Sequence, residues 1–198
     1  MQNKDAEKLS GKGDTSQKLT LMKTSADSLK KSADALNDSS LWGKKKIKKK
    51  DEKTGKEIEV EDYDWDKITK AVKSFVEDYN DVVKEAGESN TKDVLRNASW
   101  MTGMTDKNSN MLAKIGITIG KGNKLELDED ALKQADISSL KTVFTGYNSF
   151  VSKISQKATG ISNAANRASA TYTNNGTYSK TDSLLTSSKI DEESIEML

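Results

Sequence analysis

The residues of this chain that could do chemistry are concentrated in one basic run. Six lysines occupy seven consecutive positions, interrupted only by Ile47: Lys44, Lys45, Lys46, Lys48, Lys49 and Lys50. Such a density of positive charge could bind a polyanion, whether nucleic acid, an acidic lipid surface or a cell-wall polymer. However, Glu57, Glu59 and Glu61 follow at hairpin distance and could neutralise the lysines, and no aromatic residue that would stack on bases is interleaved. We therefore favour a solvated, neutralised hairpin and expect no nucleic-acid partner.

Other candidate sites have weaker signatures. The acidic stretch 57–66 lacks the Asp spacing and the bidentate Glu of a calcium loop. Gly120 and Gly122 join two strand-like segments, which indicates a hairpin turn rather than a phosphate loop. The chain contains no His and no Cys, so the commonest general base, a thiolate nucleophile and a zinc–thiolate site are missing. Asp and Glu are abundant but form no recognisable catalytic frame. We expect no enzymatic activity, no cofactor and no metal.

The strongest pattern is structural and lies toward both ends of the chain. Apolar residues recur there with alternating steps of three and four, which places them on one seam of an α-helix. The N-terminal seam is Leu19, Met22, Ala26, Leu29, Ala33 and Leu36. The C-terminal seam is Tyr147, Val151, Ile154, Ala158, Ile161, Ala165, Ala168 and Tyr172. Each seam needs a partner, and the spacing alone leaves open whether the two pair within one chain or with other subunits.

Composition favours long helices over a large spherical core. Only 33% of the 198 residues are hydrophobic, whereas 32% are charged, and there is no Pro to interrupt a helix. The net charge of +1 indicates no particular partner. The first twenty residues lack the apolar core of a signal peptide, and no apolar run is long enough to predict a membrane span. Export would therefore use a route without a cleaved signal.

These patterns predict an α+β fold, mainly α. Antiparallel terminal helices form a coiled-coil-like stalk, and a small head contains two β-hairpins. We expect helices over about 15–39, 66–86, 91–102 and 147–172, short helices ending near 135 and 144, and a loop over 103–110. The hairpins are expected near 44–62, with one face in water, and near 115–127. The predicted divisions are 1–43 and 147–172 for the stalk, 44–146 for the head and 173–198 for a flexible tail.

Three tryptophans, at positions 42, 65 and 100, are expected to be packing anchors. Trp100 lies near Met101 and Met104, which suits a contact between a helix and the rest of the domain.

Four short motifs occur in a fixed order along the middle and C-terminal parts of the chain. They are Phe75, Val76, Tyr79 and Asn80; Leu112, Ile115, Gly116 and Ile117; Leu125, Leu127, Asp128 and Leu132; and Val143, Phe144, Thr145 and Gly146. In this order, over about residues 66–172, the chain resembles the C-terminal region of the bacterial flagellar filament-capping family, hook-associated protein 2. The chain is shorter than is usual in that family, it has no counterpart of the large inserted head domains, and it has Asp136-Ile137 where the family usually has Pro.

The resemblance implies an extracellular structural protein of the bacterial flagellum, exported through the flagellar type III channel. Its partners would be itself, as a homo-oligomer, or other flagellar axial proteins. We therefore expect a structural assembly protein, cap-like or axial-associated, that acts through helix–helix packing. Two alternatives remain open: a secretion chaperone or helical binding module, for which a cytoplasmic location would be expected, and a polyanion-binding protein acting through the lysine-rich hairpin.

Overall fold

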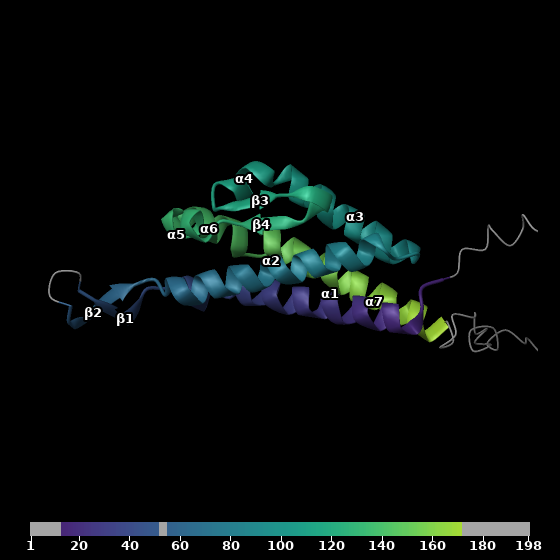
Figure 1. The fold of residues 1–198 in the computed structure, drawn as a ribbon, viewed down its shortest axis with the longest axis horizontal. Coiled ribbons are helices and arrows are strands. Elements are labelled where there is room, and N and C mark those ends of the chain that lie inside the picture. The colour runs from purple at the N-terminus through teal and green to yellow at the C-terminus, as the bar shows by residue number, and fades with distance from the viewer. Residues whose placement is uncertain (1–12, 52–54, 172–198) are drawn as a thin grey trace, which may run out of the picture.

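The computed structural model describes residues 13–51 and 55–171 (Figure 1). Seven α-helices, two short 3-10 helices and four strands occur in these ranges, which confirms the predicted α+β, mainly α class. The helices are α1 (Ser16–Asn37), α2 (Trp65–Gly87), α3 (Lys92–Lys107), α4 (Ser109–Ala113), α5 (Glu129–Gln134), α6 (Ile137–Phe144) and α7 (Phe150–Thr171). The strands are β1 (Lys45–Lys50), β2 (Glu57–Asp62), β3 (Ile117–Ile119) and β4 (Leu125–Leu127). The predicted flexible tail, 173–198, lies outside the described residues.

Three long helices form the body of the molecule. Helix α1 packs along α7 on one side and along α2 on the other, and α3 packs against both α2 and α7. Because residues late in α7 contact residues early in α1, the two terminal helices run antiparallel. In Figure 1, α4, α5, α6 and the β3–β4 hairpin form a smaller layer over the body. The terminal helices are therefore one part of a wider helical layer.

Side-chain caps define where the helices begin. Thr15 accepts a hydrogen bond from the Lys18 amide at the start of α1, and Asp64 does the same for the Lys67 amide at the start of α2. Asp128 accepts from two backbone amides at the start of α5, and Asp136 accepts from the Ser139 amide in α6. These short polar side chains satisfy amides that have no partner within the helix. Each of these helices therefore begins at a Thr or Asp side chain that caps it.

Large side chains fill the core within the body and between the body and the smaller layer. Trp42, which is 1% exposed, stacks on Phe144 with ring centroids 5.4 Å apart, and its indole nitrogen donates to the Leu36 carbonyl. Phe75 of α2 meets Phe150 of α7 edge to face at 6.2 Å. Trp42 is thus the packing anchor that the sequence predicts.

The predicted loop over 103–110 is wrong. Helix α3 continues to Lys107 and α4 begins at Ser109. Val94, Ala98, Met101 and Thr105 are all buried, so the stripe that holds α3 against the core extends beyond the predicted end. Packing of this stripe outweighs the low helix propensity of Gly103, which lies on the exposed side.

The β1–β2 hairpin extends beyond the ends of the helices (Figure 1). Its antiparallel register pairs Lys45 with Asp62 and Lys50 with Glu57, so the hairpin expected near 44–62 is confirmed. The expectation of a single wet face is wrong, because the apolar face is also open to solvent: Ile58 is 42% exposed and Ile47 and Val60 are only partly buried. The hairpin alternates in sequence as an amphipathic strand does, but no core lies beneath it.

Candidate functional site

The interface between α1 and α7 contains most of the residues that we predicted from heptad spacing. All six positions of the N-terminal seam are at most 2% exposed. Five positions of the C-terminal seam are fully buried: Val151, Ile154, Ala158, Ile161 and Ala165. Ala168 is half-buried at the edge of the same core. In the single chain these residues therefore form a shared hydrophobic core.

The two tyrosines at the ends of the C-terminal seam are not part of this core. Tyr147 precedes α7 and is 83% exposed, so its placement on the seam is wrong. The chain turns at Gly146, whose φ is +100°, and α7 starts only at Phe150. A heptad pattern extended backwards through a turn no longer describes one helix face. Tyr172 lies outside the described residues.

A pair of polar contacts fixes the register of the two terminal helices. The hydroxyl of Ser162 donates to Asp27 at 2.6 Å, and the hydroxyl of Ser155 donates to Asp34 at 2.7 Å. The two aspartates are one heptad apart, and so are the two serines, so the same contact repeats along the antiparallel interface. A shift of either helix by one turn would break both contacts. We call these four residues the Asp–Ser ladder.

Each ladder aspartate is also paired within its own helix. Lys23 lies 2.6 Å from Asp27, and Lys30 pairs with Asp34 in the same way. The Lys23 and Ser162 hydrogen bonds lower the pKa of Asp27 below its usual value. Burial alone would raise the pKa of Asp34, but the hydrogen bonds from Lys30 and Ser155 outweigh it and lower the pKa. Both carboxylates are therefore stabilised in the charged form.

A third aspartate fastens the start of α1 to the connection between α2 and α3. Asp14 is 3% exposed and accepts hydrogen bonds from the hydroxyls of Ser89 and Thr91, at 2.6 and 2.7 Å, and from the backbone amides of Asn90 and Thr91. Lys18 lies 3.7 Å away. Burial raises the pKa of Asp14, but these hydrogen bonds and the lysine outweigh it, so the pKa is lowered. We call this cluster the Asp14 clasp.

The ladder and the clasp were missed in the sequence. A signal for the ladder exists: Ser-Ala-Asp occurs at 25–27 and again at 32–34, and Ile-Ser occurs at 154–155 and again at 161–162. Both repeats are heptads, so they could have suggested a repeated contact. The clasp has no such signal, because its members are more than seventy positions apart.

The lysines of the basic run face carboxylates in the structure. Four of the six cross-strand pairs join a lysine of β1 to an acidic residue of β2. Lys49 lies 2.5 Å from Asp62, Lys48 lies 3.7 Å from Glu57, and Lys44 approaches the ring of Tyr63 at 5.8 Å. Lys44, Lys45, Lys46, Lys48, Lys49 and Lys50 are all exposed. The neutralised hairpin has the charge pattern that we favoured over a polyanion site.

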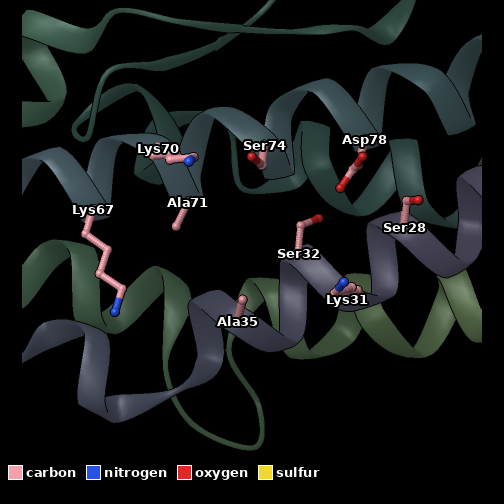
Figure 2. A pocket seen from close by; sticks show the side chains of 9 residues that line it. All are labelled: Ser28, Lys31, Ser32, Ala35, Lys67, Lys70, Ala71, Ser74 and Asp78. Atoms are coloured by element: carbon pink, nitrogen blue, oxygen red, sulfur yellow. The ribbon is translucent and has the colours of Figure 1, made fainter.

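A groove of about 520 Å³ runs between α1 and α2 (Figure 2). Small side chains line it, including Ala35 and Ala71, which project toward each other from the two helices in Figure 2. Lys31, Lys67 and Lys70 supply three positive charges, and Asp78 supplies one negative charge. Burial raises the pKa of Asp78, the nearby Asp81 and Glu77 raise it further, and a hydrogen bond from Ser32 opposes them. The groove can accept an elongated segment with small apolar and acidic side chains.

The motif residues on α2 have structural roles. The phenol of Tyr79 is buried and donates to Thr105 of α3 at 2.9 Å, and burial raises the pKa of Tyr79 to about 12. The side-chain amide of Asn80 donates to the carbonyl of Leu125 and accepts from its amide, at 2.8 and 2.7 Å. Asn80 thus takes the place of a neighbouring strand at β4. These contacts hold α3 and the second hairpin against the body.

Two glycines lie where another segment of the chain approaches the backbone closely. A Cβ at Gly160 of α7 would lie 2.8 Å from the Asn97 side chain of α3, and a Cβ at Gly116 would lie 2.7 Å from the Asp128 carbonyl.

The other two tryptophans are less buried than Trp42. Trp65 is partly buried and meets Tyr63 edge to face at 6.3 Å. Trp100 is 43% exposed and lies beneath the Lys157 ammonium at 4.3 Å, so its expected role as a packing anchor is wrong.

Neither a metal site nor a membrane-spanning helix is found in the described part of the chain. Across residues 13–51 and 55–171, no three His, Cys, Asp or Glu side chains come together as metal ligands would. Over the same ranges, no helix combines the length and the apolar character needed to cross a membrane.

The described chain is thus a helical body whose terminal helices run antiparallel around a shared hydrophobic core, in a register fixed by hydrogen bonds. The model of the flagellar hook-associated protein 2 C-terminus family matches residues 88–197, more than half of the chain, and the chain belongs to this family. This match confirms the family resemblance described above, although the motif at residues 75–80 lies outside the matched range. The family is one of flagellar structural proteins rather than enzymes. No curated protein and no solved structure matches the chain.

Proposed function

We propose that this protein is an extracellular structural component of the bacterial flagellar axis, at or near the filament cap, and that it acts by packing against axial proteins or further copies of itself. The observation that carries this proposal is the family match over residues 88–197. That range includes α3 to α7, of which α7 packs along α1 and α3 packs against α7. A structural role is also what the Asp–Ser ladder would serve, because it fixes one arrangement of the terminal helices.

The mechanism that the geometry supports is rigid presentation of outer surfaces. Apart from Tyr147 and Tyr172, the residues of the two seams are buried or half-buried within the chain, so contacts with other proteins would use surfaces that the folded chain leaves open. Two such surfaces are the α1–α2 groove and the β1–β2 hairpin at the far end of the body. Tight side-chain packing in the body gives the groove a fixed shape, whereas the hairpin extends from the body with no core beneath it.

The proposal is tested by where the protein is found. We would place an epitope tag on the full chain in its host and probe sheared flagella, washed cells and culture medium. The protein should be in the flagellar fraction, and it should remain inside cells when flagellar export is blocked. Deletion of its gene should shorten or remove filaments and reduce swimming. A tagged protein found only in the cytoplasm of export-competent cells, with filaments unchanged by the deletion, would contradict the proposal.

The α1–α2 groove favours a second candidate, a secretion chaperone or helical binding module. Its small side chains admit a helix backbone closely, and its excess of lysines suits an amphipathic helix with acidic flanks. A chaperone would stay in the cytoplasm while its client was exported, and it would remain a monomer or dimer at all concentrations in light scattering. The fractionation experiment therefore separates the two candidates.

A further inference from the structure

The β1–β2 hairpin is a two-stranded sheet with two open edges. Among the described residues, β1 and β2 pair only with each other, and their sheet extends beyond the helices (Figure 1). An isolated two-stranded sheet is marginally stable in water, and each outer edge is a row of backbone donors and acceptors. Ile47, Ile58 and Val60 also share one face of this sheet and are at least partly exposed. These features suit a surface that another strand completes.

The hydrogen-bonding pattern shows which residues present their backbone to each edge. The Asp51 amide donates to the Lys56 carbonyl at 2.9 Å, so positions 51 and 56 form a hydrogen-bonded pair. Such pairs alternate along an antiparallel ladder, so the pairs 49–58, 47–60 and 45–62 bond inward. The outward amides and carbonyls then belong to Lys46, Lys48 and Lys50 on β1, and to Glu57, Glu59 and Glu61 on β2. Each edge therefore presents residues of a single charge.

We propose that hairpins of neighbouring copies pair edge to edge, with the basic β1 of one copy antiparallel to the acidic β2 of the next. The occupant of each edge is thus a second copy of this chain. This inference rests on the proposed assembly role and names a contact through which copies would associate. Charge selects the arrangement: two β1 edges would place Lys opposite Lys, two β2 edges would place Glu opposite Glu, and only the mixed pair places Lys opposite Glu.

This pairing has a geometric consequence. In the order β1, β2, next β1, next β2, every strand is antiparallel to its neighbour, so all hairpins point the same way and all helical bodies lie on one side. The contact is heterologous and closes into a ring if the rotation between copies permits. The alternate positions meanwhile bring Ile47 next to Ile58 and Val60 of the neighbour, which removes apolar surface from water. The same step that pairs the charges also covers the exposed face.

The experiment measures the mass of the full chain by sedimentation velocity and light scattering over a range of concentrations and salt. We expect the mass to rise with concentration and association to weaken about tenfold or more at high salt, because exposed charges are screened. Glu59→Pro removes one outward amide without removing an inward hydrogen bond, so it should abolish association. Glu59→Gln, the matched control, keeps the amide and should retain association with a modest loss.

A second variant tests the charge rule while keeping the hairpin complementary. It exchanges Lys46, Lys48 and Lys50 for Glu and Glu57, Glu59 and Glu61 for Lys, so opposite charges still face each other within and between copies. This variant should associate like the parent, whereas reversing only the lysines should abolish association. The proposal is overturned if the parent is a monomer at every concentration, or if Glu59→Pro leaves association unchanged. Fractionation is independent of both results: a monomer that is present in sheared flagella refutes only the edge pairing, and an edge-paired oligomer confined to the cytoplasm refutes only the flagellar role.

Discussion

The α1–α7 interface and the β1–β2 hairpin both pair polar side chains across two elements, but only the interface has a buried apolar core beside the pairs. In the interface, the Asp–Ser ladder lies beside fully buried alanines and isoleucines. In the hairpin, ion pairs such as Lys48–Glu57 have side chains that are 70% and 72% exposed. Water competes for the hairpin charges, and salt screens them.

The difference shows what polar pairs contribute in each setting. Where apolar burial already holds two elements together, a hydrogen bond to a carboxylate selects one register among several. Where no core lies beneath, the same pairing adds little to the stability of folding but still excludes partners of like charge. The following five predictions test this contrast, from the largest expected effect to the smallest.

Trp42→Ala should destabilise the body most, because it removes a fully buried indole and its stacking on Phe144. We expect a loss of about 3–5 kcal/mol in the free energy of unfolding, measured by urea denaturation. Trp100→Ala is the matched control, since Trp100 is 43% exposed, and its loss should be far smaller. If the two variants lost equal amounts of unfolding free energy, burial would not be what makes Trp42 important for stability.

Asp14→Asn should open the clasp between α1 and the connection from α2 to α3. The amide keeps the size of the side chain but loses the charge that receives four hydrogen bonds, so we expect a loss of about 2 kcal/mol. Asp106→Asn, at an exposed position on α3, provides the control. Hydrogen exchange should speed up at residues 88–91 in Asp14→Asn only; unchanged exchange there would rule out the clasp.

Asp27→Ala and Asp34→Ala each remove one rung of the ladder and should each cost about 0.5–1 kcal/mol at neutral pH. Because their pKa values are lowered in the folded state, this stability is present above the unfolded value of 3.8 and is lost as pH falls through the lower folded values. Denaturation at pH 7 and at pH 2 checks this. A penalty that persists fully at the lower pH would show that charge is not the cause.

Asp78→Asn should stabilise the protein slightly at neutral pH. The pKa of Asp78 is raised, so folding favours its protonated form, and that contribution is lost as pH rises through the folded pKa. Removing the charge should therefore raise the free energy of unfolding by about 0.5 kcal/mol. Thermal unfolding at pH 7 measures the gain, and a lower melting temperature in the variant would refute it.

Lys48→Ala and Glu57→Ala should change the stability of the body by less than about 0.5 kcal/mol. The pair is 3.7 Å apart and exposed on the hairpin, away from the core. A double-mutant cycle in low salt isolates its coupling energy. If this coupling matched that of Asp34 with Ser155, the hairpin would have to be supported by packing that the single chain does not show.

Periodicity made much of the helical body predictable. The seams of α1 and α7 follow from local spacing, and their described positions are buried as expected except for Tyr147 and the half-buried Ala168. The end of α3 was not predictable from the same signals, because Gly103 and the polar residues after it are typical of a loop. Burial of Thr105, which bonds to Tyr79 on another helix, decides that end.

The candidate site residues also differ in whether local sequence or tertiary contacts determine them. The basic run and its acidic complement could be identified by inspection, but their register is known only from the structure. Tyr147 could not be placed correctly, because it lies in the turn that follows Gly146, and α7 begins only at Phe150. The groove between α1 and α2 has no sequence signature, since small residues on two helices become a groove only when those helices pack side by side.

The amino-acid sequence by itself determined the helical faces, the two hairpins, the lack of His and Cys, and the family. These follow from spacing and composition, which act over a few residues. Tertiary structure alone decided that the two seams pack against each other in one chain, that Asp14 accepts hydrogen bonds from residues 89–91, and that the charged hairpin extends away from the core. Those outcomes depend on which distant segments meet, and that choice minimises exposed apolar area over the whole chain rather than over any one segment.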